Sequence, residues 1–206
     1  MYFAAISQVE GYWHGLFASG QIPARADVDP RGIETALHHA FLLERVAPGV
    51  ARLRLAGMQL HDLMGMEVRG MPLSAMFTPD TRTTLAGAID LVCDKQCLCD
   101  LELESSAGLG RGLLHGRVFM APLRDEFGKV SRILGCLEVK GDLGRTPRRF
   151  DTVRARFREL DTVRFAEPEK APRLRQVAFA EEQAPYVAPP KRSDNQPRIR
   201  LVYSAD

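Results

Sequence analysis

The chain lacks long hydrophobic segments. Its 206 residues contain no apolar run that approaches the ~18–20 residues a membrane span requires. The N-terminus also lacks a basic segment followed by a hydrophobic stretch, which is the pattern of a secretory signal peptide. We therefore expect a cytoplasmic protein that has no membrane partner.

The chain also has little net charge. Its 28 lysines and arginines nearly balance its 26 aspartates and glutamates, which gives a formal net charge of +2. Dedicated nucleic-acid-binding proteins usually carry a large positive excess. The overall charge therefore argues against nucleic acid as a partner, although it says nothing about local patches.

Cysteine is scarce, and its spacing is only weakly metal-like. Three of the four cysteines lie in the run Cys-Asp-Lys-Gln-Cys-Leu-Cys, as Cys93, Cys97 and Cys99, and the fourth is Cys136. A structural zinc site needs four ligands in pairs, and this run has no second pair and no nearby histidine. We expect free thiols in a reducing compartment and no metal site. A redox response is a weaker alternative, because no neighbouring motif indicates a lowered thiol pKa.

Signatures of known catalytic sites are missing as well. The sequence has no glycine-rich phosphate loop followed by a helix and lysine, no serine elbow, no zinc-protease helix and no kinase motif. Asp62 and Glu67 could form an acid pair, but without a recognisable cleft such a pair is ordinary surface. We predict that the protein is not an enzyme.

A β-hairpin that runs into a short helix is the clearest pattern in the chain. Pro48 and Gly49 stand between two apolar runs and predict a tight reversal. On the second arm, apolar residues alternate with Arg52 and Arg54, as expected for a strand with one buried face. From Met58 the apolar spacing becomes helical, and Gly65 predicts the helix end.

Helical spacing also appears before and after this hairpin. Near the N-terminus one stripe of apolar residues predicts an amphipathic helix, formed by Ile6, Val9, Trp13, Leu16 and Phe17. Asp29 and Pro30 predict the start of a short helix that ends near His38 and His39, which point in different directions and so do not predict a metal site. A longer helix is predicted from Asp80 to Val92. The first stripe could pack on the chain's own sheet or on the same helix of a second copy.

Three further strands follow, over residues 98–104, 113–123 and 130–139. The short polar loops between them require antiparallel pairing. The sequence therefore predicts an α+β fold with a five-stranded antiparallel sheet, short helices on one face, an N-terminal amphipathic helix and an irregular C-terminal tail. We divide the chain into residues 1–20 (helix), 21–142 (domain) and 143–206 (tail).

The tail differs in composition from the rest of the chain. It holds seven of the 13 prolines and a basic run of arginines, and it reads as partly disordered, with a short helix over residues 152–160. The arginines could be solvated surface or could contact an acidic partner or nucleic acid. The last apolar cluster, residues 199–203, could add a strand to an exposed sheet edge.

Several segments in series resemble a known family. The stretches IPARADVDPRGIE, FLLERVAPGVARLRLAG, LMGMEVRGMPLS, RILGCL and PRRF, in this order and spacing, are similar to the bacterial stand-alone PAS-like domains. The similarity runs from about Tyr12 to Phe150. It implies a five-stranded antiparallel sheet with helices over one face, and a sensory or interaction role.

The resemblance also implies a pocket between helices and sheet, which some PAS domains fill with haem, flavin or a metabolite. The photochemical flavin type resembles GxNCRFLQ around its cysteine, which does not occur here, and the helix from Asp80 to Val92 has no histidine for haem. Both cofactors are disfavoured, and the sequence requires none. The candidate ligand pocket is mostly apolar: Leu55, Met58, His61, Met76, Phe77, Val118 and Met120.

We predict a non-catalytic signalling regulator that binds another, unidentified signalling protein, and that forms a homodimer through the N-terminal helix stripe. One alternative is a sensor whose pocket holds a small molecule or cofactor. Another is a nucleic-acid-associated regulator that uses the basic tail.

Overall fold

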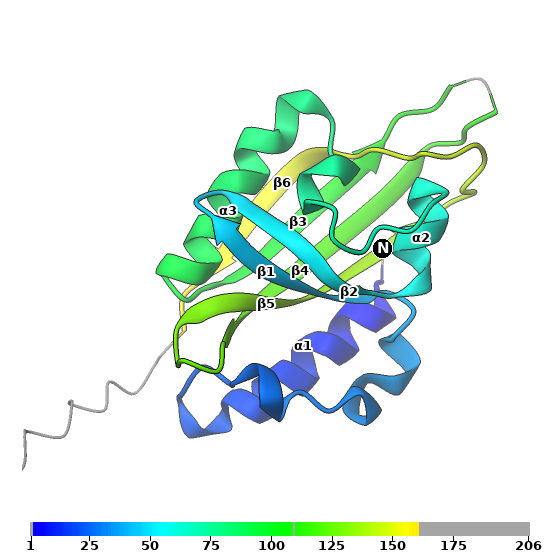
Figure 1. Cartoon of the computed structure of the whole chain (residues 1–206). Helices are drawn as coiled ribbons and strands as arrows, with labels where there is room; N and C mark the ends of the chain where they lie inside the picture. The colour runs from blue at the N-terminus through cyan, green and yellow to red at the C-terminus, as the bar shows by residue number, and fades with distance from the viewer. Residues whose placement is uncertain (1, 109, 161–206) are drawn as a thin grey trace, which may run out of the picture. The chain divides into compact units, whose positions relative to one another are not determined.

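A six-stranded sheet forms the centre of the molecule. The computed structural model describes residues 2–108 and 110–160. All strand pairs are antiparallel, and their order is β2-β1-β5-β4-β3-β6, so β2 and β6 are the outer strands (Figure 1). The strands are β1 (Ala40–Ala47), β2 (Val50–Ala56), β3 (Leu98–Ser105), β4 (Leu114–Arg124), β5 (Val130–Lys140) and β6 (Asp151–Arg158).

The predicted hairpin and helix are confirmed. β1 and β2 pair around Pro48 and Gly49, and Gly49 has a φ of +68°, which glycine adopts more readily than any residue with a side chain. Helix α2 spans Met58–Met64, and Gly65 ends it in the left-handed conformation with a φ of +69°. The turn residues thus determine where the hairpin reverses and where the helix stops.

Helices α2 and α3 (Arg82–Asp94) cover one face of the sheet, together with a short 3-10 helix, Leu73–Met76. The helix predicted from Asp80 to Val92 corresponds to α3, which buries Leu85, Ile89 and Val92 against the strands. A large apolar core fills the space between this helix layer and the sheet, and most of its side chains are fully buried.

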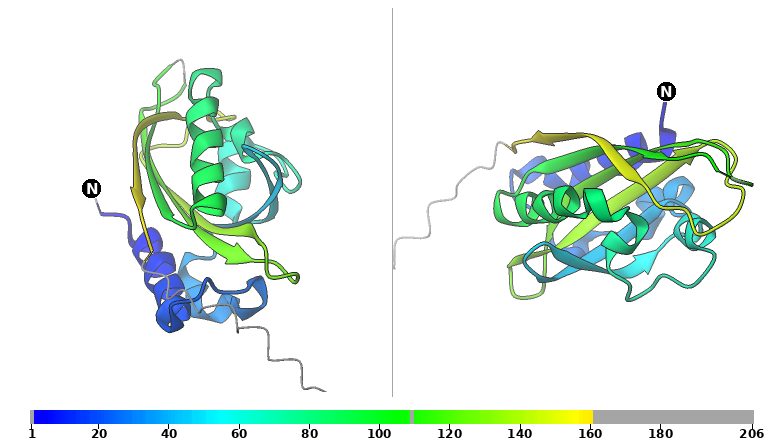
Figure 2. Two further views of the ribbon diagram at one scale, coloured as in Figure 1. Left: turned by 90° about the vertical axis from the view of Figure 1, so that its left-hand side faces the viewer. Right: turned by 90° about the horizontal axis from the view of Figure 1, so that it is seen from above.

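Helix α1 (Ala4–Leu16) and a 3-10 helix, Pro30–Ala36, cover the other face (Figure 2). The side chains of Ile6, Val9 and Trp13 are at most 1% exposed, and the Trp13 indole Nε1 donates a 3.0 Å hydrogen bond to the Pro122 carbonyl. Of the two packings that the sequence left open, the structure shows the intramolecular one. The short helices therefore lie on both faces, since Pro30–Ala36 packs beside α1.

A buried carboxylate holds the start of α1 on the sheet. Glu138 of β5 is 4% exposed, and its Oε2 accepts hydrogen bonds from the backbone N–H groups of Ala5 (2.9 Å) and Ile6 (3.4 Å). Its Oε1 lies 2.6 Å from Lys140 Nζ. A negative charge is favourable at a helix N-terminus, where the first backbone N–H groups have no helical partner.

The predicted helix over residues 152–160 is wrong, because Asp151–Arg158 forms strand β6 and pairs with β3. This strand lies beyond residue 142 and gives the sheet six strands instead of the predicted five. Arg154, Arg156 and Arg158 alternate with smaller or apolar residues, and that period of two is a strand pattern. The expectations for residues 161–206, including the apolar cluster at 199–203, lie outside the described residues.

Candidate functional site

The structure does not bring the seven predicted pocket residues together. Met76, Phe77, Val118 and Met120 are at most 1% exposed and belong to the core between the helix layer and the sheet. These four side chains therefore lie together between the helix layer and the sheet, where the pocket was predicted.

The other three residues lie on the surface at two separate places. Met58 is 59% exposed and, with His61, lines an open depression of about 600 Å³ on the outer side of α2. His61 Nδ1 is 3.6 Å from a Glu67 carboxylate oxygen there. Leu55, on β2, is 49% exposed and lies at a different cleft.

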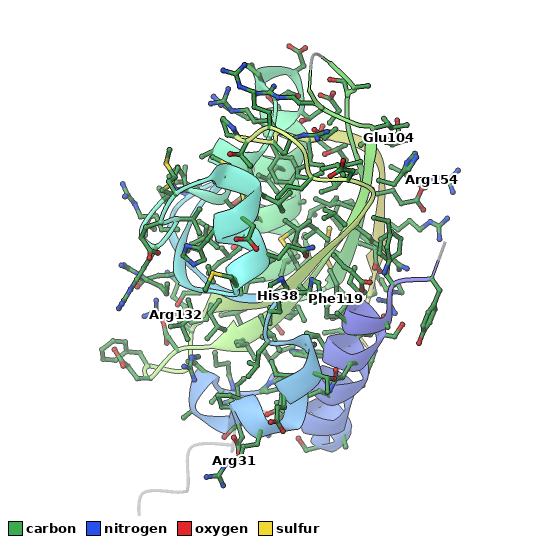
Figure 3. The ribbon with its side chains drawn as sticks, turned by 90° about the vertical axis from the view of Figure 1, so that its right-hand side faces the viewer. Arg31, His38, Glu104, Phe119, Arg132 and Arg154 are labelled. Atoms are coloured by element: carbon green, nitrogen blue, oxygen red, sulfur yellow. The ribbon has the colours of Figure 1, made fainter. Side chains whose placement is uncertain are left out.

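This cleft, here called the β1–β2 cleft, has a volume of about 690 Å³. Its floor comes from β1, β2 and β5, and its walls come from residues 24–26, the turn between β4 and β5, and the loop that carries Arg69. Seven of its twelve lining residues are charged: Arg25, Glu44, Arg54, Arg69, Asp125, Glu126 and Arg132. Figure 3 labels Arg132 on this part of the molecule.

The sheet register explains the charged floor. Glu44 of β1 lies opposite Arg132 of β5, and its carboxylate is 2.6 Å from Arg132 Nη1. The same carboxylate accepts hydrogen bonds from Arg54 of β2. Opposite charges on neighbouring strands stabilise the pairing, so this row of three residues is partly structural.

Asp125 also has a structural part in the cleft wall. Its Oδ1 accepts hydrogen bonds from the backbone N–H groups of Phe127 and Lys129, both at 2.9 Å, and its Oδ2 accepts one from Ser131 at 2.6 Å. The Ser131 hydroxyl and these N–H groups lower the pKa of the Asp125 carboxyl. Asp125 is therefore committed to the turn between β4 and β5.

Two arginines at the cleft, unlike Arg54 and Arg132, form no salt bridge with a described residue. Among the described residues, the guanidinium groups of Arg25 and Arg69 have no carboxylate within salt-bridge distance. Both line the cleft, so they are available to an anionic group that enters it. Arginine is well suited to this task because its planar guanidinium binds a carboxylate with two hydrogen bonds.

An apolar extension joins this charged region. It has a volume of about 170 Å³ and shares Arg25, Leu42 and Leu55 with the cleft. Its remaining lining is mainly apolar and includes Val28, Ile33, Leu37 and Leu134. The cleft can therefore hold a group that is apolar at one end and negatively charged at the other.

Sequence reasoning found only Leu55 of this site. The alternation of apolar residues with Arg52 and Arg54 placed Leu55 on the buried face of β2, and it did not show which strand would lie beside β2. Leu55 is instead 49% exposed. Arg25, Arg69 and Arg132 come from segments that meet only in the folded chain. Glu44 was the one detectable signal, as the single acid on a strand whose other residues, apart from Arg45, are apolar.

The four cysteines are free and buried. Burial raises the pKa of the Cys93 thiol to about 11 and also raises the pKa of the Cys99 and Cys136 thiols. Such thiols are protonated and weakly nucleophilic at neutral pH. Within residues 2–108 and 110–160, no group of three histidine, cysteine or acidic residues is placed to hold a metal ion. In the same residues, no helix combines the length and apolarity that crossing a membrane requires.

Comparison with known proteins gives a family model and several solved structures. A model described as a PAS domain matches residues 1–138. No curated protein matches the chain. One similar structure is a light-oxygen-voltage domain studied with a flavin analogue, at 16% identity and a TM-score of 0.40, covering 54% of this chain and 84% of that one.

Two further structures have a similar sequence identity and TM-score. An RNA-binding light-oxygen-voltage receptor is 15% identical with a TM-score of 0.39, covering 57% of this chain and 35% of that one. The light-state Aureochrome1 light-oxygen-voltage domain, from a blue-light photoreceptor, is 16% identical with a TM-score of 0.38, covering 54% of this chain and 88% of that one.

Proposed function

The chain belongs to the PAS domain family, and from this premise we propose that it is a signalling protein that acts by binding another protein, without chemistry of its own. The β1–β2 cleft is the contact surface in this proposal. The observation that supports it most is the pair of uncommitted arginines, Arg25 and Arg69, beside the exposed apolar side chain of Leu55. Arginine next to exposed apolar area is typical of the centre of protein interfaces.

The geometry favours a partner segment with an apolar residue followed by an acid. The apolar residue would enter the extension beside Leu42 and Leu134, and the acid would lie between Arg25 and Arg69. A homodimer remains part of the proposal, but the α1 stripe would not form its contact, because α1 is packed on the chain's own sheet. A cytoplasmic location is likewise a proposal.

A photo-crosslinking amino acid at position 55 tests this function in extracts of the native host. The matched control is position 46, because Val46 and Leu55 lie on the same hairpin with similar exposure, 46% and 49%. We expect position 55, but not position 46, to give one discrete protein adduct, and Arg69→Glu to reduce its yield. Equal labelling at both positions, or labelling that Arg69→Glu leaves unchanged, would overturn the proposal.

A small-molecule sensor is the second candidate, and the size of the cleft favours it. Its volume of about 690 Å³ lies within the range of about 300–1,000 Å³ that is typical of ligand sites. Native mass spectrometry and a visible absorbance spectrum of the full chain, purified from its host, distinguish the two candidates. A stoichiometric small molecule or a flavin spectrum favours sensing, and an unliganded mass favours protein binding.

A further inference from the structure

Strand β6 is an outer strand of the sheet, at the opposite edge from the β1–β2 cleft. It pairs with β3 on one side only. The other outer strand, β2, is covered along part of its outer edge, where Leu53 exchanges backbone hydrogen bonds with Gly70 and Met71. Among the described residues, the backbone from Thr152 to Arg158 has no such cover on its outer side.

The side chains of β6 fall into two rows because successive residues point to opposite faces. Arg154, Arg156 and Arg158 form one row, and Ala155 and Phe157 form the other. Phe157 is 42% exposed, which is high for a large apolar side chain on a strand. One face of this edge is therefore basic and the other is apolar.

The basic row continues an alternation of charge across the sheet. In register, Arg154 of β6 lies opposite Glu102 of β3, Glu102 lies opposite Arg117 of β4, and Arg117 lies opposite Glu138 of β5. Reading outward from β5, the signs are negative, positive, negative and positive. The next position outward, on a strand added beside β6, would be negative.

The three arginines differ in whether a carboxylate of the same chain already forms a salt bridge with them. Arg158 is bound to Asp100 at 2.9 Å and to Glu10 at 2.5 Å, and Arg156 lies 3.4 Å from Glu102. Arg154 is exposed, and within the described residues no carboxylate lies within salt-bridge distance of it. Figure 3 shows Arg154 at the outer edge of the strands, near Glu104.

Charge also decides against a second copy of this chain as the added strand. In an antiparallel β6–β6 pair that keeps like faces together, each arginine would lie opposite an arginine of the other copy. Like charges directly opposite each other destabilise a strand pair. Exposed charges on an edge strand are a common protection against such self-pairing.

We propose that the outer edge of β6 binds an extended acidic segment of a partner protein by strand addition. Acids at alternating positions would lie opposite Arg154 and Arg156, and the residues between them would be apolar and pack beside Phe157. Backbone hydrogen bonds would supply much of the affinity, and the two rows of side chains would supply selectivity. This edge is separate from the β1–β2 cleft, so binding here does not depend on the role proposed for the cleft.

The test uses the full chain and two short synthetic peptides of equal length. One alternates glutamate with valine, and the other alternates lysine with valine. We expect the glutamate peptide to bind in a calorimetric titration, more weakly as salt is raised, and the lysine peptide not to bind. Hydrogen exchange should show new protection in residues 151–158 when the glutamate peptide is bound, because strand addition satisfies backbone N–H groups there.

Substitutions locate the binding. The double variant Arg154→Glu/Arg156→Glu should bind the glutamate peptide about tenfold more weakly and gain affinity for the lysine peptide. A glutamate at position 154 would face Glu102, and the repulsion between the two acids could disturb the strand pairing. A second variant, Arg154→Gln/Arg156→Gln, therefore removes the positive charges without adding negative ones. Arg31→Glu is the control, since Arg31 is exposed and lies well away from Arg154 in Figure 3.

Three results would overturn the proposal. The first is that neither peptide binds, which means that the arginines only protect the edge. The second is equal binding of both peptides. The third is binding that the β6 substitutions leave unchanged, or that protects residues outside 151–158.

Discussion

Arg148 shows how much structure one buried charged residue can hold together. Its side chain is 1% exposed, and its guanidinium donates hydrogen bonds to carbonyl oxygens of Leu143 at 2.7 Å, Gly112 at 2.6 Å and Ser105 at 3.2 Å. These carbonyls belong to the end of β3 and to the segments before β4 and after β5. Arg148 therefore joins three chain segments at one end of the sheet.

Replacing Arg148 with methionine should cost about 2–3 kcal/mol in the free energy of unfolding, because several buried carbonyl groups would lose their donor. Chemical denaturation of both proteins measures the difference. Arg149→Met is the matched control, since Arg149 is the next residue and is exposed. We expect the control to change stability by no more than about 0.5 kcal/mol. Equal effects of the two substitutions would refute the role given to Arg148.

Cys93 gives the molecule a pH dependence in the alkaline range. Burial raises its thiol pKa to about 11, whereas an unfolded thiol titrates near ~8.5. The folded protein then keeps a proton that the unfolded chain releases. The stability due to the neutral thiol is fully present below the unfolded pKa and is lost as the pH rises through the folded pKa.

Between pH 9 and pH 11, the Cys93→Ala variant should lose stability less steeply than the parent protein, by up to about 1.4 kcal/mol per pH unit. Urea denaturation at several pH values gives the two slopes. The cavity left by the smaller side chain shifts the whole curve without changing its slope. Parallel curves would show that the Cys93 thiol does not titrate differently on folding.

The residue scale is also where the sequence predicts least. A cysteine, an arginine or a glutamate carries no mark of its burial. The pattern around Arg148 suggested solvated surface, and nothing near Glu138 indicated that it would hold the start of α1. These roles depend on contacts between segments that are distant in the sequence. For example, Arg148 and Gly112, which share a hydrogen bond, are 36 residues apart.

At the scale of elements, α1 illustrates a pattern that predicts a helix but not what covers it. The apolar stripe was read correctly, because helical spacing alone determines it. Burial on its own sheet and burial on a second copy satisfy the same hydrophobic requirement. The hydrogen bonds that α1 makes with Pro122 of β4 and Glu138 of β5 favour burial on its own sheet.

Trp13→Ala should therefore destabilise the fold by about 3–5 kcal/mol, because it removes a fully buried aromatic side chain. Denaturation followed by circular dichroism measures the change. Light scattering on the same samples distinguishes this result from dimer dissociation. A variant with unchanged stability and a halved mass would show that α1 forms a contact between copies. His14→Ala is a suitable control, since His14 is exposed on the same turn of α1.

Strand β6 shows the opposite case. Its sequence has the period of a strand, but the prediction for this segment was a helix. Residues 153–158 alternate strictly between arginine and another residue, which is the period of a strand. The basic character of the run favoured a solvated helix or tail instead. The error has a physical reason, because the strand depends on the acids of β3 for its pairing, and charge complementarity between distant segments is not visible in local periodicity.

At the scale of the whole molecule, the antiparallel order and the α+β class follow from short loops between patterned segments. The β4–β5 turn and the β1–β2 hairpin require their strands to be neighbours. What the sequence does not give is the position of β1 beside β5. That pairing places Glu44 against Arg132 and creates the floor of the β1–β2 cleft.

The same topology separates the cleft from the β6 edge. The cleft floor reaches β5, which lies three strands away from β6 in the sheet, so about 14 Å separates them at the usual spacing of about 4.8 Å per strand. Sites that far apart without shared residues should respond independently to substitution. Arg69→Glu should lower crosslinking at position 55 and leave the affinity for the glutamate peptide unchanged, while Arg154→Glu should do the reverse.

The double variant Arg69→Glu/Arg154→Glu should then show both losses at the size of the single variants. Crosslinking yield and calorimetric affinity, measured on the same preparations, provide the comparison. If Arg69→Glu alone weakens peptide binding, the peptide occupies the cleft instead of the edge. If the double variant loses more at either surface than the corresponding single variant, the sheet couples them, and occupation of one would change the affinity of the other by the same factor in both directions.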